Sequence, residues 1–572
     1  MSSLYVGTSG LGSSQNSINT TAHNLSNVDT KGFVRQQVLQ TDSRYQTIGT
    51  TRISYMQVGL GTDIAAVYQF RDSFLDNSYR QQIGRQGFYE EQSAAVEEIE
   101  NVFGELEGVA FQDSIEGLWV SLQELAKEPD SIVARASLIQ TSVTFLERAH
   151  NVSNQLNEYQ LNLNTEIIGK VDRINEIADQ IAFLNDKIVS AEAGNVENAN
   201  DYRDQRNLLL DELGQMIKIS YRETPNGCVT VMAEETQFIT EDRINYMGLT
   251  TVNETSDMLK PVWIGLGNVD VFDFSQPPEL AKDTDIGSLK GLLLARGDRQ
   301  GKYTDIPVRK NYDNDADYEA AVEQYNKEVN PSVIVSVQAE FDQLIHGIVT
   351  MINDTLCPNK EIELADGTRI KVLDENAPIG MDENGTAGEA LFNRKSFERY
   401  SDPVEVTVRN EDGTYETKTV RIYNEEDSTD NYSLFTLGEI EVNQNIMSNY
   451  SLIPLSNKDG SGEFDIATAQ ALISNWQKNF ATINPNTLTE CNYNDYYTNF
   501  IGEIANRGEQ LKTLSTNQED MVHTIDTQRQ SAHGVSSDEE LTNLIRFQHA
   551  YNASARYINV VSEMLEHIVT RL

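Results

Sequence analysis

Cysteine, basic residues and long apolar runs are all scarce in this chain of 572 residues. Its three cysteines, Cys228, Cys357 and Cys491, stand far apart without a CxxC pair, so we expect no disulfide framework. No apolar run reaches the roughly 18 residues that a membrane span needs, so the sequence predicts no transmembrane helix. The segment 1–21 holds neither a basic stretch nor a continuous apolar stretch, and we therefore expect no cleavable signal peptide.

Acidic residues outnumber basic residues twofold, with 88 Asp and Glu against 44 Lys and Arg. A surface this acidic repels phosphate backbones, which argues against nucleic acid as a partner. The formal charge of -44 is unevenly placed, because residues 1–70 and 541–572 each carry a net +1 and leave -46 for 71–540. Two nearly neutral ends therefore flank a strongly anionic middle.

Motifs for catalysis and for ligand binding are missing or incomplete. There is no HExxH, no GxSxG, no GxxxxGK[ST], and no GxGxxG after a predicted strand. The segment Asp313–Asp317 copies the first ligands of an EF-hand loop. However, Tyr318 stands where the loop needs glycine, and Gln324 replaces the bidentate glutamate. We therefore expect no enzyme activity, no cofactor and no metal site.

One narrow apolar stripe marks the N-terminal segment. Leu4, Leu11, Ile18 and Leu25 recur every seven residues, which places them on one face of a helix. Gly7, Gly10 and Gly12 interrupt this pattern, and each glycine costs about 0.8–1 kcal/mol relative to alanine in a helix. We expect this segment to be largely unfolded in water when it stands alone.

The C-terminus carries a fuller apolar row, with alternating spacings of three and four residues. Such a row is typical of a coiled-coil seam that needs a partner, because burying each Leu, Ile or Phe contributes about 1.5–3 kcal/mol. The N-terminal stripe is one candidate partner, and docking of the C-terminal helix on its own domain is the alternative. The row consists of Leu544, Phe547, Tyr551, Ser554, Ile558, Val561, Leu565, Ile568 and Leu572.

The middle of the chain alternates between helical and strand periodicity. A helix over 131–192 is predicted after a turn at 129–131, and at about 1.5 Å per residue it would span roughly 90 Å. A second helix is predicted from Asn200. From 217 the period changes to two around a turn at Pro225–Gly227, which predicts a hairpin.

Helical and β-type sequence alternate again in the second half. A helix is predicted near 331–357, a β-rich region over about 360–455, and helical sequence from about 464 to the end, with a break around 530–537.

These patterns predict a multidomain α+β protein with an elongated helical or coiled-coil frame made from both chain ends and two β-rich inserted domains. We expect an assembly-dependent terminal coiled coil (1–71 and 535–572), a helical rod domain (72–216, 286–358 and 460–534), and β-rich insertions at 217–285 and 359–459.

The segment Ala22–Arg35 resembles the N-terminal signature of the bacterial flagellar axial proteins, the family of rod, hook and hook-associated proteins. That signature is close to A-N-N-I-A-N-x-x-T-x-G-[YF]-x-R. His23 departs from its first asparagine. The matching positions are Asn24, Asn27, Thr30, Gly32 and Arg35.

Two further segments resemble the hook-associated junction proteins within that family. The C-terminal stretch GVSSDEE (534–540) and NLIRFQHAYNASAR (543–556) is similar to their ending, although Ser537 departs from a usual apolar residue. The interior block NDYRDQR (200–206), followed by Leu208 and Leu213, is similar to their N-D-L-x-D-Q-R segment. Residues 220–285 and 360–455 match the family poorly.

The resemblance implies a structural role outside the cell, in the flagellum at the junction between hook and filament. It implies export through the flagellar type III apparatus without a cleavable signal peptide. The implied partners are further copies of the chain in a ring, the hook protein, a second junction protein, and a cytosolic export chaperone that binds the C-terminal helix. The predicted assembly residues are the N-terminal stripe, the matching Asn24, Asn27, Gly32 and Arg35, and the C-terminal row without Ser554.

Three alternatives remain open from the sequence. The hook protein shares the N-terminal signature, but it lacks the NDYRDQR-type block and the long helix before it. A secreted coiled-coil adhesin or effector could share the acidic composition and the heptads. An enzyme housed in a β insertion is the third, although residues 360–455 show no histidine cluster.

Overall fold

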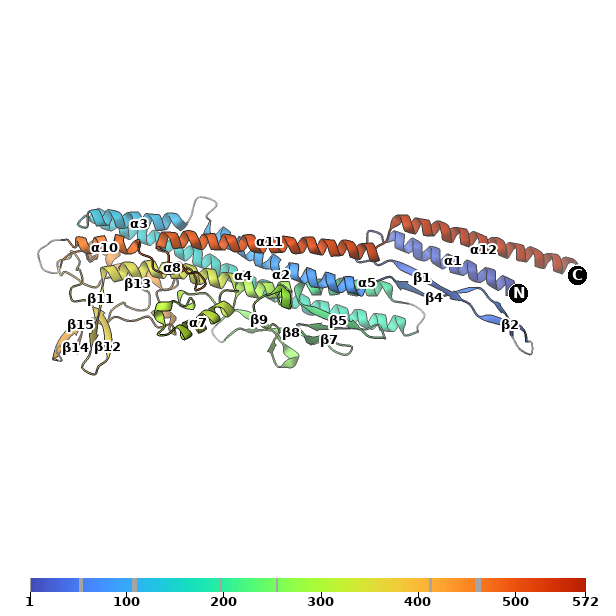
Figure 1. Cartoon of the computed structure of the whole chain (residues 1–572), viewed down its shortest axis with the longest axis horizontal. Helices are drawn as coiled ribbons and strands as arrows, with labels where there is room; N and C mark the ends of the chain where they lie inside the picture. The colour runs from blue at the N-terminus through green and yellow to red at the C-terminus, as the bar shows by residue number, and fades with distance from the viewer. Residues whose placement is uncertain are drawn as a thin grey trace.

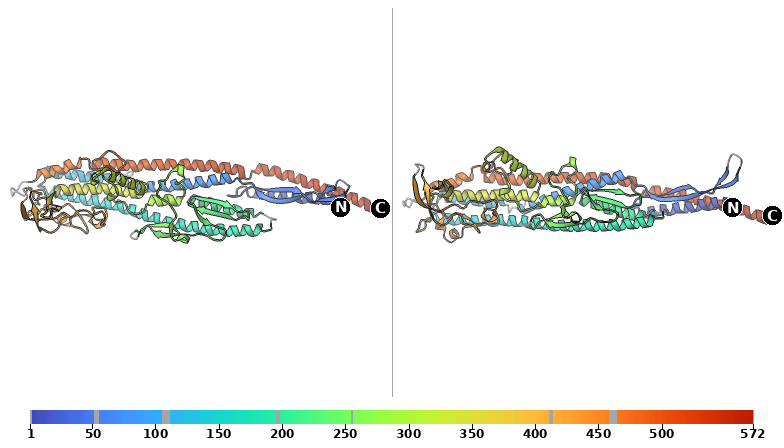
Figure 2. Two further views of the ribbon diagram at one scale, coloured as in Figure 1. Left: turned by 60° about the horizontal axis from the view of Figure 1, so that its bottom comes forward. Right: turned by 90° about the horizontal axis from the view of Figure 1, so that it is seen from below.

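The structure, a computed structural model, describes residues 2–50, 55–104, 111–194, 198–253, 256–410, 414–457 and 464–571. The molecule is an elongated rod in which long helices run nearly parallel to its axis (Figure 1). Both chain termini lie at one end, and small β hairpins lie at the other. The turned views in Figure 2 show that the rod is slender in every direction. The predicted α+β class with an elongated helical frame is confirmed.

Helices make up most of the rod. In chain order they are α1 (Ser2–Ser26), α2 (Ser73–Phe103), α3 (Phe111–Lys127), α4 (Ile132–Glu192), α5 (Asn200–Met216), α6 (Ser288–Arg296), α7 (Asp315–Glu328), α8 (Val333–Leu356), α9 (Gln444–Ser448), α10 (Ile466–Trp476), α11 (Tyr493–His533) and α12 (Ser537–Arg571).

The strands pair locally into small antiparallel sheets. The pairs β1–β4 and β2–β3 form a ribbon, β5–β6–β7 and β8–β9–β10 form three-stranded sheets, and β11–β12, β13–β16 and β14–β15 are two-stranded. The strands are β1 (Gln36–Asp42), β2 (Tyr45–Thr50), β3 (Tyr55–Gly59), β4 (Thr62–Gln69), β5 (Ile219–Glu223), β6 (Val229–Ala233), β7 (Thr236–Ile239), β8 (Met247–Thr251), β9 (Leu259–Trp263), β10 (Val269–Asp270), β11 (Asn359–Glu363), β12 (Arg369–Leu373), β13 (Phe392–Arg394), β14 (Val404–Arg409), β15 (Tyr415–Val420) and β16 (Ile440–Val442).

Several local predictions are confirmed. The long helix is α4, whose 61 residues begin after Ser131, and the Ser131 side chain caps it by accepting from the Ala134 N–H. The hairpin around Gly227 is β5–β6, and Gly227 has the positive φ of 85° that its turn needs. The break between α11 and α12 falls at residues 534–536.

One range differs from its expectation. Residues 1–71 were assigned to the terminal helical coiled coil, but α1 ends at Ser26 and is followed by strands β1, β2, β3 and β4. The ribbon lies along α1. Several polar side chains of α1 form hydrogen bonds with the ribbon. Ser9, for example, accepts from the Thr62 N–H at 3.3 Å. Short alternating polar and apolar stretches therefore became strands, because α1 supplies the surface against which they pair.

The main apolar core is made by the body of the rod. Where α2, α3, α8 and α11 meet, aromatic rings pack edge to face with centroids 5.0–5.4 Å apart. The rings belong to Phe103, Phe111, Phe341 and Phe500. Most of α8 is buried, as expected for a helix that is apolar on most sides.

Three asparagines on one face of α4 fix the first β region to the helices. Asn185 donates to the Val229 carbonyl at 2.9 Å and accepts from the Val229 N–H at 3.0 Å. Asn175 makes the same pair of bonds with Met247, and Asn164 bonds to the chain before and in β9. Spacings of 11 and 10 residues are close to three helical turns, so the three amides share one face.

Glycines let three helices cross at short range. A Cβ atom on Gly84 of α2 would stand 2.5 Å from the Gly214 carbonyl oxygen of α5. A Cβ on Gly291 of α6 would stand 2.7 Å from the Phe88 carbonyl oxygen of α2. Backbone atoms cannot move away as a flexible side chain can, so these crossings require glycine.

Candidate assembly site: the terminal helix pair and its joint with the body

The two chain ends form a helix pair at one end of the rod. α1 and α12 lie side by side (Figure 1). Gly7 faces Ile558 and Gly10 faces Ser554, so residue numbers rise along α1 as they fall along α12. The pair is therefore antiparallel. The pairing predicted between the two ends is present within the single chain.

Small residues of α1, rather than its leucine stripe, form the line that α12 meets. The row starts with Gly7 and the half-buried Gly10 and continues at heptad spacing through Ser14, Ser17 and Thr21, and these three are buried. The predicted leucine stripe lies beside this row on the surface of α1, and its residues are only half-buried. Small side chains take the central line because they let two helices approach closely. The stripe residues are Leu4, Leu11, Ile18 and Leu25.

The C-terminal row is covered along only part of its length. Val561 is the one row member that is buried among the described residues, whereas Leu565 and Ile568 are exposed. Leu572 lies outside the described residues. The half-buried members are Leu544, Phe547, Tyr551, Ser554 and Ile558. The last turns of α12 thus leave apolar side chains in solvent.

Asn24 ties α1, β1 and α12 together. Its side-chain amide accepts from the Gln36 N–H at 3.1 Å and donates to the Gln36 carbonyl at 2.9 Å. The same amide donates to Glu540 of α12 at 3.1 Å. With Asn24 only 1% exposed, each of these polar groups needs its partner, because an unpaired buried group is costly.

Arg35 completes this clasp from the start of β1. Its guanidinium donates to Glu540 at 2.8 Å and to Glu539 at 2.9 Å. Glu540 is buried, and both carboxylates sit in the first turn of α12, where the helix dipole favours negative charge. Two of the matching signature residues, Asn24 and Arg35, therefore meet at one carboxylate.

The other two predicted signature residues shape the turn between α1 and β1. Asn27 donates to the His23 carbonyl at 2.9 Å and accepts from the Thr30 hydroxyl at 3.1 Å. Gly32 has a φ of 80°, and a Cβ there would stand 2.5 Å from Leu208 of α5. Asn27 and Gly32 therefore make contacts within the chain. The leucine stripe of α1 and the C-terminal row of α12 instead lie beside or at the surface of the helix pair.

The NDYRDQR block is where this terminal unit (2–71 and 534–571) meets the rest of the rod, the body (72–533). Asp204 accepts from the Val34 N–H at 3.3 Å, and Asp201 accepts from Gln36 at 3.4 Å. Asn200 donates to the Val67 carbonyl at 3.2 Å and receives Gln69 on its own carbonyl at 3.1 Å.

The remaining charged residues of the block face the body. Arg203 pairs with Glu192 at 2.9 Å. Arg206 donates to Asn185 at 2.9 Å and to the Gly227 carbonyl at 2.7 Å. The first two turns of α5 thus present carboxylates to the terminal unit and guanidinium groups to the body.

A buried ion network lies beside the block, where α2 begins and α11 ends. Arg529 contacts Asp76 at 2.8 Å and Asp211 at 2.7 Å, and Arg80 contacts Asp211 at 2.7 Å. Burial opposes ionisation of Asp76, yet Arg71 and the other nearby guanidinium groups hold its pKa below the usual value. The network fixes the start of α2 against α5 and α11.

Two titratable groups at this joint are shifted by burial. Burial raises the pKa of Asp204 to about 7, although the Val34 amide and Arg71 act in the opposite direction. Burial lowers the pKa of His533, whose Nε2 accepts from the Asp72 N–H. The His533 carbonyl accepts from the Arg35 N–H at 2.9 Å. His533, the last residue of α11, therefore bonds both to Asp72, where the chain enters α2, and to Arg35 of the terminal unit.

Sequence reasoning did not identify the block, His533 or Arg529 as site residues. The available signal was the density of Asn, Asp and Arg in the first turns of a helix that otherwise carries leucines. The partners of Asp201, Asp204 and Arg529 lie more than 100 positions away along the chain, so only the fold brings them together.

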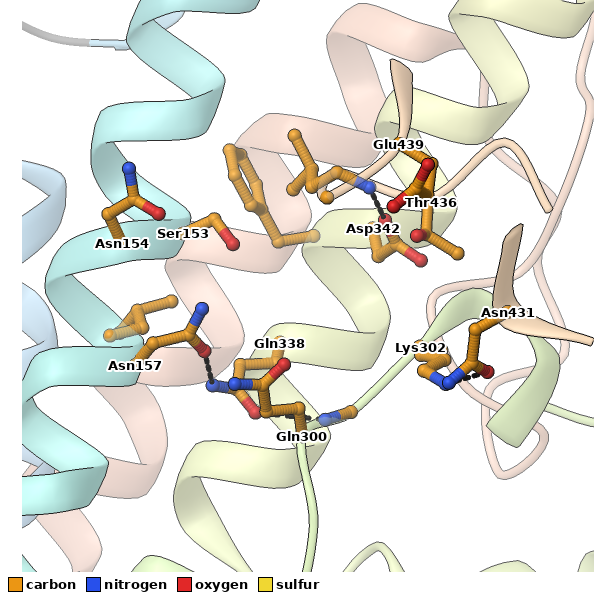
Figure 3. A pocket seen from close by; sticks show the side chains of 15 residues that line it. Ser153, Asn154, Asn157, Gln300, Lys302, Gln338, Asp342, Asn431, Thr436 and Glu439 are labelled. Atoms are coloured by element: carbon orange, nitrogen blue, oxygen red, sulfur yellow. Dashed lines mark hydrogen bonds between the residues drawn. The ribbon is translucent and has the colours of Figure 1, made fainter. Parts of the chain in front are cut away.

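A polar cavity of about 220 Å³ lies elsewhere, between α4, α8 and the chain near residue 437 (Figure 3). Asp342 reaches into this region, where it accepts from the Leu437 N–H at 2.8 Å and the Tyr303 N–H at 3.0 Å. Gln338 donates to Asn157 at 2.9 Å. The carboxylate is thus committed to holding loops in place.

The EF-hand lookalike is a helix cap. Asn314 accepts from the Asp317 N–H at 2.8 Å and begins α7, while Asp315 pairs with Arg309. In the described ranges, no three His, Cys, Asp or Glu side chains gather as a metal site would require. Among the same residues, no helix is long and apolar enough to cross a membrane.

Three family profiles match this chain. The flagellar hook-associated protein FlgK helical domain matches residues 96–357. The C-terminal profile of the flagellar basal body rod proteins FlgEFG matches 531–571, and the flagella basal body rod protein profile matches 4–33. The two terminal matches contain most of α1 and all of α12.

Curated relatives are similar over nearly the whole chain. Flagellar hook-associated protein 1 of Bacillus subtilis is 26% identical over 568 residues, covering 98% of this chain and 96% of the relative. Flagellar hook-associated protein 1 of Escherichia coli is 24% identical over 582 residues, covering 98% of each chain.

A solved structure shares the fold. The flagellar hook junction protein FlgK from Burkholderia pseudomallei superposes with a TM-score of 0.53 at 13% sequence identity, over 80% of this chain and all of that one. The solved structure shows the fold alone, whereas the profile matches and the nearly full-length relatives show that the chain is similar to flagellar hook-associated protein 1 and support a structural role in the bacterial flagellum.

Proposed function

We propose that the terminal unit packs with neighbouring copies around the flagellar axis and that the body forms the outer part of the hook–filament junction. The observation that carries this proposal is the incomplete cover of the terminal helix pair. Apolar side chains along α12 stay exposed, among them Ile545 at 56%, Met564 at 61% and Val569 at 77%. Such surface is unfavourable on an isolated molecule and is removed by packing against further helices.

Charge placement supports the same arrangement. The nearly neutral ends can pack closely around an axis, whereas the -46 between them would repel itself if it were crowded there. The body therefore stays in solvent, where we place its contacts with hook subunits on one side and with a second junction protein on the other. A ring of copies gives every terminal unit the same neighbours.

We further propose that the chain leaves the cell through the flagellar export apparatus without a cleavable signal peptide. Three buried free cysteines, with no disulfide among them, suit a chain that must pass a channel unfolded. A cytosolic chaperone would hold the apolar end of α12 before export, because Leu565, Ile568 and Val569 are exposed there.

The terminal pair is expected to become fully ordered only on assembly. Its seam on α1 is glycine, serine and threonine, which bury little apolar area, and α1 begins with three glycines within its first 12 residues. Neighbouring copies would supply the missing apolar contacts.

Deletion of residues 558–572 tests the proposal. The truncated chain should fail to bind the chaperone and to build the junction, so that cells carry hooks without filaments in electron micrographs. The body should stay folded, as reported by the fluorescence of Trp119, Trp263 and Trp476, which all lie in it. Filaments attached to hooks built from the truncated protein would contradict the proposal.

Two single substitutions refine this test. Ile568→Asp places a charge on the exposed apolar side of α12 and should weaken assembly. His567→Asp, at an exposed neighbouring position, is the matched control and should assemble normally. Immunogold labelling of the wild-type protein should mark one site per flagellum, at the end of the hook. Label along the whole hook would instead indicate a hook protein.

A further inference from the structure

We propose that residues Asn200–Arg206 are positioning residues that set the direction of the terminal unit. On this proposal the unit leaves its seat as an intact piece while the body stays folded. This inference concerns the single chain and stands apart from the proposed assembly. The role assigned to the block is to orient one part of the chain on another, and it involves neither catalysis nor contact with another subunit.

The first observation is that the main apolar core stops short of the joint, where Val34 is buried and Gly32 lies against Leu208. The contiguous core of buried apolar side chains runs from Ala95 to Ile504 and contains no member of the terminal unit among the described residues. An apolar core makes two parts unfold together, because separating them exposes all its surface at once. Without one, the unit is held against the body by the local contacts of the joint.

The second observation is that polar bonds make most of the joint. Val34 and Gln36 reach Asp204 and Asp201, and the Arg35 N–H reaches the His533 carbonyl. Water offers equivalent partners to each of these groups when the parts separate. Hydrogen bonds are directional, so this seat fixes an orientation, and the buried ion pair Arg71–Asp76 beside the step into α2 adds to it.

The third observation is a polar cavity of about 350 Å³ at the same place, under β4 and between the start of α2 and α5. It is lined by Gln69, Arg71, Asn200, Arg203 and Tyr221, among others. A space of this size holds several waters at about 30 Å³ each. Water can therefore reach the joint and take over its hydrogen bonds one by one.

The chain crosses between unit and body at only two places. One is the step from β4 into α2 near Asp72, and the other is the break at 534–536 between α11 and α12. His533 bonds to the backbone at Asp72 and at Arg35, so the two crossings lie close together. Two neighbouring crossings do not by themselves fix the angle between the terminal unit and the body. The bonds of Asp201 and Asp204 fix that angle.

The block is suited to this role because it faces both ways. Arg203 and Arg206 anchor it to the body through Glu192 and Asn185. Asp204, one position from Arg203, accepts from the terminal unit and lies 3.8 Å from Arg71. Removing its carboxylate should therefore unseat the unit without loosening the block.

The test measures amide hydrogen exchange in the full chain, with the terminal pair locked by a disulfide introduced through Gly10→Cys and Ser554→Cys. In locked Asp204→Ala we expect exchange at Val34 and Arg35 to be at least tenfold faster than in the locked wild type. The Arg35 N–H donates to the His533 carbonyl of the body and not to Asp204, so its acceleration reports unseating of the unit. Amides of α1 and of α8 should keep their rates.

Two further variants separate positioning from simple damage. Asp204→Asn retains an acceptor oxygen for the Val34 N–H and should restore slow exchange. Tyr202→Ala changes an exposed side chain on the same turn and should exchange like the locked wild type.

Three results would overturn the proposal. Unchanged exchange at Arg35 in Asp204→Ala would show that the block does not seat the unit. Equal acceleration in α1 would show that the unit unravels, and equal acceleration in α8 would show that unit and body open together.

Discussion

Gly7 of α1 lies against Ile558 of α12 so closely that a Cβ atom on Gly7 would stand 2.6 Å from Ile558 Cγ1 and 3.1 Å from the Tyr557 ring. A coiled coil of two large apolar seams would hold its helices further apart. The close approach leaves the leucine stripe of α1 at the edge of the contact, where it is available to further helices.

Gly7→Ala should therefore weaken the α1–α12 pair by about 1–3 kcal/mol, the usual cost of inserting a methyl group into a filled space. Faster amide exchange over residues 2–26 would report it. Gly12→Ala is the matched control, because nothing lies within 4 Å of its Cβ position and it is also in α1. That control should slow exchange, since alanine favours the helix by about 1 kcal/mol. Equal effects of the two substitutions would contradict the observed register.

Cysteines at positions 10 and 554 should form a disulfide in the isolated chain. A Cβ on Gly10 would stand 3.9 Å from Ser554 Cβ, inside the range of about 3.5–4.5 Å that disulfides need. Thiol titration should find three free cysteines, the native ones, and non-reducing electrophoresis should show a shifted band. Cysteines at positions 12 and 554 should stay reduced, because Gly12 has no neighbour within 4 Å.

Gly291→Ala should destabilise the body by about 1–3 kcal/mol, because its Cβ would meet the Phe88 backbone at 2.7 Å. Tryptophan fluorescence during chemical unfolding would measure the change. Gly169→Ala, in the middle of α4 with open space around it, should instead stabilise the chain by about 1 kcal/mol. A stabilising effect at position 291 would show that α2 and α6 do not cross there.

Glu340 should make the body less stable as the pH rises. Burial, with a smaller contribution from Glu503, raises its pKa to about 8, against an ordinary value of 4.5. The folded state therefore binds its proton more tightly than the unfolded state does. This stabilisation is complete below about pH 4.5 and is lost as the pH rises through about 8.

The variant Glu340→Gln isolates this contribution. A difference of this size corresponds to a few kcal/mol, at about 1.4 kcal/mol per pKa unit. The free energy of unfolding should fall between pH 5 and pH 9 more steeply in the wild type than in the variant. Parallel pH profiles would show that burial does not raise the pKa of this carboxyl group beyond what nearby Arg507 offsets.

Local pattern was enough to predict the long elements. The period of 3.6 along 131–192, with Ser131 as a cap, determined α4, and the alternation around Gly227 determined the first hairpin. The signature residues Asn24 and Arg35 were found as well, because a long motif is specific even without a structure. These features depend on neighbours within a few turns, which a sequence displays directly.

Contacts between distant segments were out of reach. Strands β1 to β4 could not be seen, because their short, mixed stretches become a ribbon only where α1 lies beside them. The block at 200–206 was visible as a motif, but its partners at 34–36 and 67–69 lie more than 100 positions earlier.

What the sequence by itself determined is therefore the set of long helices, the charge contrast between ends and middle, and the motif positions. Only the tertiary structure decided which face of α1 meets α12, because helix approach depends on the size of the facing side chains and not on hydropathy alone. Likewise, only the fold gathers Asp204, Arg35 and His533 at one polar joint, since hydrogen bonds need groups within about 3 Å in space at any separation along the chain.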